Sequence, residues 1–175
     1  MQVKVRNSMV ELVLGDIVRQ ETDAVVNAAN RRLAPGGGVA GAIHGAAGPE
    51  LWEECKKLGG CKTGEAKITG GYNLVARYVI HTVGPVYSGS PRDRELLASC
   101  YENSLKLALS QNIGSISFPA LSTGVFGYPM DEAATVALKT VTDFLKRSRE
   151  IKVRFVLRDK DALKIHEEKL KSPFT

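Results

Sequence analysis

Hydrophobic and polar positions along the chain follow two periods, one typical of strands and one typical of helices. Short apolar runs rich in β-branched residues predict buried strands, as at 24–28. Apolar residues at helical spacing, among them Leu97, Tyr101 and Leu105, predict a long helix over 93–111. The whole pattern predicts strands over 3–6, 10–14, 24–28, 66–69, 78–83, 113–120 and 153–157, and helices over 39–47, 50–58, 93–111, 131–146 and 161–170.

Predicted strands and helices alternate through most of the chain. This order predicts an α/β protein, in which helices cover both faces of a sheet. No linker or internal repeat interrupts the 175 residues, so we expect one domain over 1–175. No apolar run approaches the roughly 18 residues of a membrane span, and the first residues lack the apolar segment of a secretory signal. We therefore expect a cytoplasmic protein without a membrane segment.

The composition narrows the range of partners. A formal net charge of +5 permits an anionic partner, such as a nucleotide or a nucleic acid. The basic residues near the C-terminus are mixed with acids and lack interleaved aromatic residues, which favours a solvated surface over a nucleic-acid site. The three cysteines and three histidines show no metal-ligand spacing, so we expect no metal and no cofactor. A monomer is the simplest expectation for such a chain.

A glycine-rich loop follows the predicted strand 24–28 and precedes the predicted helix 39–47. In α/β sheets, ligands bind where strands end, and glycines together with a helix N-terminus suit a phosphate group. The alternative is a flexible connector. Gly36, Gly38 and Gly41 also satisfy the GxGxxG dinucleotide pattern, but the acid expected about 20 residues further on is missing, which disfavours an NAD-dependent dehydrogenase.

Two further loops follow predicted strands. The segment 122–129 again combines glycines and hydroxyls with a helix entry, so two loops at one sheet edge are expected to hold a diphosphate between backbone amides. A plain turn without a ligand is the alternative. Asp16 ends the strand 10–14, where its carboxylate is suited to accept a hydrogen bond from an exocyclic amine such as that of adenine. Its alternative role is to cap a short helical turn.

Taken together, these segments resemble the macrodomain family, and they occur in the family's order. The resemblance implies a three-layer α/β/α sandwich with a mixed central sheet and a cleft for ADP-ribose. It rests on the segments 15–17, 27–30, 36–44, 78–85 and 122–129, which nearly fill the chain.

The resemblance also implies roles for single residues. Asp16 would bind the adenine amino group, and the Ile17 N–H would add a contact. Asn30 would bind hydroxyls of the distal ribose, against which Phe126 would pack, and Asn30 is the one residue implied for catalysis. The diphosphate would lie between the first loop, at Gly37, Gly38 and Val39, and the main chain of Ser122, Thr123, Gly124, Val125 and Phe126.

Two positions depart from the family pattern. Hydrolases that resemble this chain carry Gly-Val-Asp-Gly, whereas this chain has Ala40 in place of the aspartate, so no carboxylate acts as a general base there. Some relatives instead position water with the ligand's own phosphate and the first loop. After the last predicted strand, Arg158 replaces an aromatic residue, and it either stacks on adenine or faces solvent. We interpret His44 and His81 as structural.

The sequence therefore predicts a protein that binds ADP-ribose, either free or attached to protein. Two functions follow from that binding. The first is hydrolysis of mono-ADP-ribosyl-protein esters or deacetylation of O-acetyl-ADP-ribose, and the second is recognition without catalysis. A nucleic-acid-binding function has little support beyond the positive charge.

Overall fold

The central sheet is antiparallel at its two edges and parallel between them. The computed structural model describes residues 1–172. In that part of the chain the strands are β1 (Gln2–Val5), β2 (Ser8–Leu14), β3 (Ala24–Ala28), β4 (Ala66–Gly70), β5 (Tyr78–Thr82), β6 (Ser115–Phe118) and β7 (Lys152–Leu157). Their order across the sheet is β1-β2-β7-β6-β3-β5-β4, with antiparallel β1–β2 and β4–β5 pairs.

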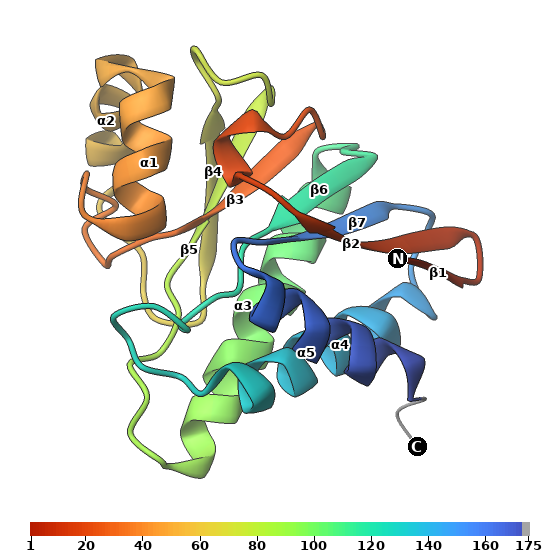
Figure 1. Cartoon of the computed structure of the whole chain (residues 1–175). Coiled ribbons are helices and arrows are strands. Elements are labelled where there is room, and N and C mark those ends of the chain that lie inside the picture. Colours follow the sequence, from red (N-terminus) through yellow and green to blue (C-terminus); the bar gives the residue numbers. More distant parts are fainter. Residues whose placement is uncertain (173–175) are drawn as a thin grey trace.

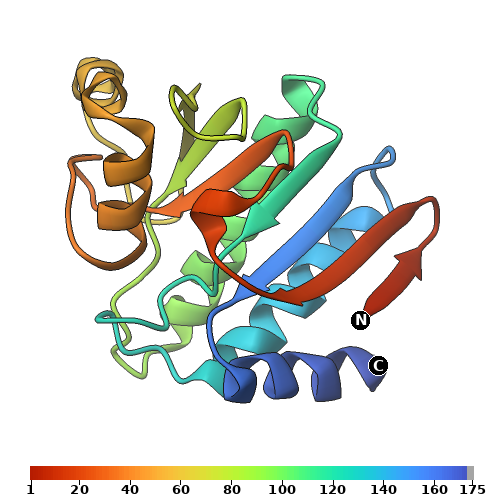
Figure 2. The ribbon, with the colours of Figure 1, turned by 45° about the horizontal axis from the view of Figure 1, so that its top comes forward.

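Helices cover both faces of this sheet (Figures 1 and 2). One face carries α1 (Gly38–Ala47), α2 (Pro49–Cys55) and the 3-10 turn η1 (Ile17–Arg19), and the other carries α3 (Pro91–Ser110), α4 (Met130–Leu145) and α5 (Lys160–Lys171). A second 3-10 turn, η2 (Lys56–Leu58), extends α2. The three-layer α/β/α sandwich with a mixed sheet is confirmed.

Successive residues of the parallel strands are buried on opposite faces. Val25 and Val79 pack against α1 and α2, whereas their neighbours Val26 and Ile80 pack against the α3 side. Strands buried on both faces read as continuous apolar runs rather than as alternation. This explains why the run 24–28 predicted its strand at the observed bounds.

Several predicted boundaries shift by one or two residues, and two predicted elements extend beyond the observed ones for a clear physical reason. The strand predicted over 113–120 covers only Ser115–Phe118. The Gly114 N–H donates instead to Asp23 Oδ2 at 3.0 Å, and Pro119 has no N–H to continue the ladder. The helix predicted over 50–58 is α-helical only to Cys55 before it tightens into η2.

Within residues 1–172, no helix is both long and apolar enough to cross a membrane. The same stretch contains no group of three or more His, Cys, Asp or Glu side chains placed to hold a metal ion. Cys55, Cys61 and Cys100 are buried free thiols.

Candidate functional site

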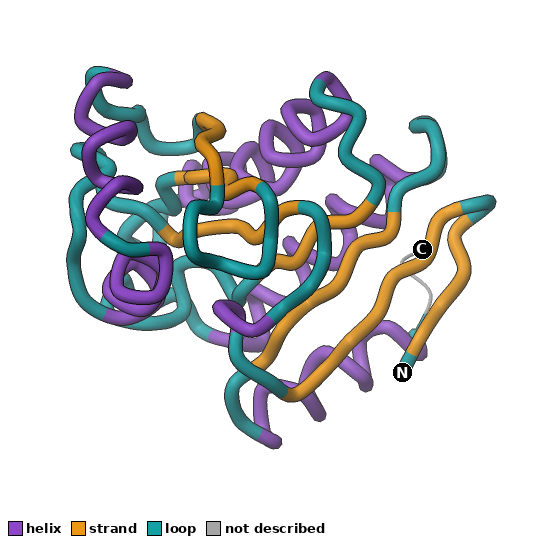
Figure 3. The backbone as a smooth tube through the Cα atoms, turned by 90° about the horizontal axis from the view of Figure 1, so that it is seen from above, coloured by secondary structure: helices purple, strands orange, loops and turns teal. Residues whose placement is uncertain are grey.

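Five neighbouring parallel strands bring their carboxyl ends to one edge of the sheet. Across that edge, the order β2-β7-β6-β3-β5 places Asp16 first, then Arg158, then the loop after β6 and the loop after β3. Figure 3 draws these connections in teal. β3 and β6 pair through only two residue pairs, ending at Val25 and Ser117, so their loops diverge. Ligands of α/β sheets bind at such an edge, where the strand order reverses.

The first loop, residues 29–37, is shaped by the side chain of Asn30. Asn30 Oδ1 accepts hydrogen bonds from the N–H groups of Arg32 at 3.1 Å and Ala34 at 3.0 Å, and Asn30 Nδ2 donates to the Ala34 carbonyl at 2.8 Å. The carboxamide therefore folds the loop as its own local scaffold. One Nδ2 hydrogen is left to donate to a ligand, which suits a ribose hydroxyl oxygen.

Glycines open the end of the first loop. Gly38 has a φ of +56° at the start of α1, and side chains added at Gly37 or Gly38 would meet no atom within 4 Å. A Cβ at Gly41 would lie 2.4 Å from the Gly36 carbonyl oxygen, so α1 and the loop touch there. The first N–H groups of a helix have no intrahelical partner. The open backbone thus presents unpaired donors at Gly38 and Val39.

The second loop, residues 119–129, is closed on itself by backbone hydrogen bonds. The Tyr128 N–H donates to the Ser122 carbonyl at 2.9 Å, and the Gly127 N–H donates to the Gly124 carbonyl at 2.9 Å. Val125 at its tip is fully exposed, and Phe126 is half-buried. In the described part of the chain, no acceptor takes the N–H groups of Gly124, Val125 and Phe126.

The connection after β5 supports the second loop from below. A Cβ at Gly84 would lie 2.2 Å from Ser122 Oγ, so only glycine lets Ser122 occupy this position, where its own φ is +68°. The Tyr87 N–H donates to the Phe126 carbonyl at 2.8 Å. The sequence predicted a strand over 78–83 and gave no sign of this support. The contact between Gly84 and Ser122 can be recognised only in the structure, because the two residues are far apart in the sequence.

At the other end of the edge, Asp16 caps η1. Asp16 Oδ1 accepts a hydrogen bond from the Val18 N–H at 3.1 Å, which confirms the capping role that the sequence left open. The carboxylate is exposed, and the side chain of Ile17 is buried against the α1 side. The Gly15 N–H donates to the Leu157 carbonyl at 2.9 Å, which ties this turn to β7. Arg158 follows directly and is exposed, as both of its predicted roles require.

Asn30, Gly36 and Ala40 converge beside the first loop. A Cβ placed on Gly36 would lie 3.5 Å from Asn30 Nδ2 and 4.0 Å from the methyl group of Ala40. Ala40 is 5% exposed, so its methyl group forms part of the floor below the loop. Alanine offers no acid or base at this position.

Two buried histidines, His81 on β5 and His44 on α1, lie below the first loop. His81 is fully buried, with Nδ1 3.0 Å from Asn27 Nδ2 and Nε2 2.9 Å from Thr69 Oγ1. Burial, helped by nearby His44, lowers the pKa of His81 to about 3, so this ring is neutral. Burial also lowers the pKa of His44. An uncharged ring pinned on both nitrogens agrees with the structural interpretation of His81.

A separate groove of about 770 Å³ lies between α3 and α4. Its lining mixes aromatic, basic and acidic side chains, including Tyr87, Arg94 and Glu132, and contains none of the predicted binding residues. The candidate site is therefore the sheet edge and not this groove.

The fold and this edge define an α/β protein whose two loops present backbone donors to an anion. The model of the Macro domain family matches residues 26–137, and the chain belongs to that family.

Individual relatives agree with this membership. The ADP-ribose glycohydrolase MACROD2 of Xenopus laevis is 54% identical over 154 residues, which are 85% of this chain but only 37% of the relative. The solved macrodomain of Oceanobacillus iheyensis with ADP has a TM-score of 0.95 and 45% identity, covering 98% of this chain and 94% of that one. The Trypanosoma brucei macrodomain in complex with ADP-ribose has a TM-score of 0.88 and 42% identity, covering 92% and 68%.

Proposed function

We propose that this chain binds ADP-ribose, either free or attached to a protein, at the carboxyl edge of its sheet. The observation that carries the proposal is the pair of loops at neighbouring strands, which present unpaired backbone N–H groups from Gly38 and Val39 on one side and from 124–126 on the other. Such donors suit the two phosphates of a diphosphate. Relatives solved with ADP and with ADP-ribose support the choice of nucleotide.

The layout of the edge favours one orientation of the ligand. Asp16 and Asn30 follow β2 and β3, which are three strand spacings apart, or about 14 Å at the usual spacing of parallel strands. One ligand reaching both residues must be elongated, with a different group at each end. The adenine amine fits the exposed Asp16 carboxylate, and the distal ribose fits the free Nδ2 hydrogen of Asn30 and the ring of Phe126.

Isothermal titration with ADP-ribose, NAD and ATP tests this proposal. We expect a micromolar or lower dissociation constant for ADP-ribose, or about 8 kcal/mol, and weaker binding of the other two. Equal millimolar binding of all three would overturn it.

Two variants of Asp16 separate capping from recognition of the base. Asp16→Asn retains an oxygen that caps η1 through the Val18 N–H, but it replaces the other carboxylate oxygen with a donor. We expect it to keep wild-type thermal stability and to weaken ADP-ribose more than ribose 5-phosphate. Asp16→Ala is expected to lose both thermal stability and affinity for ADP-ribose. Equal weakening of both ligands in Asp16→Asn would assign the residue to capping alone.

Hydrolysis of the bond at the distal ribose is the second candidate. It is favoured by the convergence of Asn30, Gly36 and Ala40 and by the similarity to a relative named as an ADP-ribose glycohydrolase. Because Ala40 supplies no base, water would have to be held by the ligand phosphate and the first loop. The same arrangement would apply to O-acetyl-ADP-ribose as a substrate.

A turnover assay decides between recognition and hydrolysis. Mono-ADP-ribosylated protein is incubated with wild type, Ala40→Asp and Asn30→Ala. Recognition without catalysis predicts equal background release from wild type and Asn30→Ala, with a gain in Ala40→Asp. Release by wild type well above that of Asn30→Ala would instead establish the hydrolase.

A further inference from the structure

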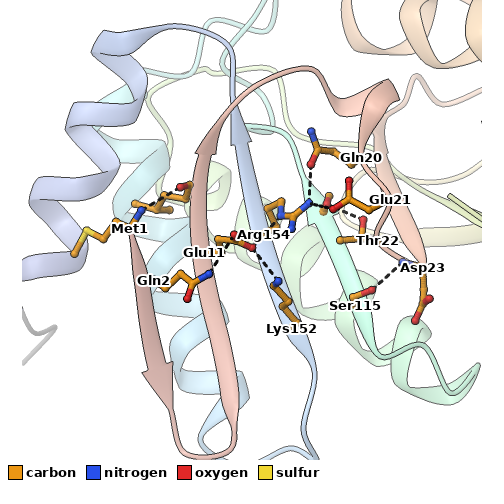
Figure 4. A network of polar contacts seen from close by, with 12 residues as sticks. Met1, Gln2, Glu11, Gln20, Glu21, Thr22, Asp23, Ser115, Lys152 and Arg154 are labelled. Carbon is orange, nitrogen blue, oxygen red and sulfur yellow. Dashed lines mark hydrogen bonds and ion pairs between the residues drawn. The ribbon is translucent and has the colours of Figure 1, made fainter. Parts of the chain in front are cut away.

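A largely covered arginine reaches from β7 toward the turn that carries Asp16. The Arg154 side chain is only 12% exposed, and its Nε donates to Glu11 Oε2 at 3.0 Å on the neighbouring strand β2. Its Nη1 donates to Gln20 Oε1 at 2.9 Å and to Glu21 Oε1 at 3.0 Å. Figure 4 shows this guanidinium between the three partners. The rigid planar fork of arginine fixes the direction of each bond.

The side chain of Gln20 links Arg154 to the main chain of Asp16. Gln20 Nε2 donates to the Asp16 carbonyl oxygen at 2.9 Å. The same nitrogen would lie 3.4 Å from a Cβ at Gly15, so the Gln20 amide closes over the turn. Arginine only donates and a carbonyl only accepts, so the two partners leave one orientation for the Gln20 amide. Arg154, Gln20 and Asp16 therefore form one directed chain of hydrogen bonds.

The residues that follow are anchored to the next strand. Thr22 Oγ1 lies 2.7 Å from Ser117 Oγ, and the Asp23 N–H donates to Ser115 Oγ at 2.8 Å. Figure 4 places Thr22, Asp23 and Ser115 at the far side of the same network. The connection from η1 to β3 is thus fixed at its end by β6. At its start, the Gln20 side chain adds a hydrogen bond to the Asp16 carbonyl beside the bond from the Gly15 N–H to the Leu157 carbonyl. A shift at Gln20 would move the Asp16 turn rather than the strand.

We propose that Gln20, held by Arg154, is a positioning residue for recognition of the adenine base. Its bond to the Asp16 carbonyl sets the main chain from which the Asp16 carboxylate and the Ile17 N–H point toward the base. This inference rests on the proposed function, because it assigns the adenine end of ADP-ribose to this turn. It predicts that Gln20 governs selectivity for the exocyclic amine and leaves the diphosphate contacts of the two loops unchanged.

The test compares ADP-ribose with its hypoxanthine counterpart, in which a carbonyl oxygen replaces the exocyclic amine and N1 carries a proton. The main variant is Gln20→Glu, which still accepts from Arg154 but turns a second oxygen toward the Asp16 carbonyl in place of a donor. We expect the dissociation constant of ADP-ribose to rise about five- to tenfold, and that of the hypoxanthine counterpart to change less than about twofold. Gln20→Ala, which leaves no charge, is expected to change selectivity in the same direction.

The matched control is Glu21→Gln. Glu21 shares Nη1 of Arg154, but among residues 1–172 its side chain makes no hydrogen bond to the Asp16 turn, so its variant is expected to bind both ligands as the wild type does. Equal weakening of both ligands by Gln20→Glu and Gln20→Ala, or no change in either, would overturn the positioning role. Failure of the wild type to bind ADP-ribose would instead refute the proposed function, and this inference with it.

Discussion

The two loops of the candidate site present similar backbone donors but are held in place by different chemistry. The first loop depends on polar side chains: Asn30 folds it, and the Asn27–His81–Thr69 hydrogen bonds lie in the strands below it. The second loop depends on close packing and neutral groups. Ser122 fits against Gly84, and the Leu121 N–H donates to the hydroxyl of the buried Tyr101 at 3.3 Å.

This difference means that the two loops should fail under different conditions. The foundation of the first loop contains titratable imidazoles, His81 and, on α1, His44. The Tyr101 hydroxyl under the second loop is neutral in acid, since burial raises its pKa from an already basic value. Acid should therefore weaken the first loop, whereas overpacking should weaken either one.

The largest effect is expected from Gly41→Ala, because the added methyl group would overlap the backbone of the first loop. The added Cβ would lie 2.4 Å from the Gly36 carbonyl oxygen, and no rotamer relieves a backbone overlap. We expect a loss of about 2–3 kcal/mol in the free energy of unfolding. We also expect ADP-ribose affinity to fall by about a hundredfold or more.

Gly45→Ala is the matched control for this variant, because it lies in the same helix and its Cβ would meet nothing within 4 Å. Helix propensity predicts a gain of up to about 1 kcal/mol there, with unchanged binding. Denaturant unfolding and titration measure both variants. Wild-type stability and binding in Gly41→Ala would show that the loop and helix do not depend on this contact.

Acid is expected to have the next largest effect, through the first loop. His81 has a pKa of about 3 in the folded chain, so below its unfolded value of about 6.5 only the unfolded chain takes up the proton. Stability is thus fully present above pH ~6.5 and falls toward pH ~3, by up to about 1.4 kcal/mol per pH unit. From pH 6.5 to 5 this amounts to about 2 kcal/mol. Hydrogen exchange should accelerate in residues 29–38 before 119–128.

His81→Gln sharpens this prediction, because glutamine accepts from Asn27, donates to Thr69 and does not titrate in this range. It should flatten the pH dependence and remove the acceleration in the first loop. His166→Gln is the control: the pKa of His166 is also lowered by burial, but this residue lies on α5 and packs against Phe155 of β7. His166→Gln should flatten the pH dependence without changing hydrogen exchange in the first loop. An unchanged slope in His81→Gln would contradict the assignment of the acid sensitivity to His81.

Gly84→Ala tests the packing of the second loop. Its Cβ would overlap Ser122 Oγ, and we expect a loss of about 1–2 kcal/mol in the free energy of unfolding. ADP-ribose affinity should fall about tenfold. Because the overlap is with a side chain, adding Ser122→Gly should restore most of both properties, and glycine also suits the φ of +68°. A double variant as weak as Gly84→Ala alone would place the conflict elsewhere.

The sequence predicted the position of both loops but not the contacts that hold them. Period and strand-end position predicted the layers and brought Asp16, Gly36 and the segment 122–126 to one edge, because parallel strands end together. The sequence could not show that the Asn30 side chain makes three hydrogen bonds within its own loop. Those bonds depend on the path of the chain between residues 30 and 34.

Contacts between residues far apart in the sequence likewise could not be predicted. Gly84 and Ser122 are 38 positions apart, and Arg154 reaches Gln20 across 134 positions. No local pattern encodes such a pair, and each residue alone suits an ordinary turn or surface strand. The roles of the binding residues stay predictions, and the titrations proposed above test them at the adenine end.

Tyr101→Phe is expected to have the smallest effect, because it removes one hydrogen bond from the second loop and leaves the packing intact. The ring lies 5.0 Å from Phe118 and 6.1 Å from Phe155, contacts that phenylalanine keeps. The Leu121 N–H loses its acceptor, so we expect thermal unfolding to show a loss of about 1 kcal/mol. Tyr72→Phe, at an exposed hydroxyl, should lose less than about 0.5 kcal/mol. If the two variants lose equal stability, the second loop is held by packing alone.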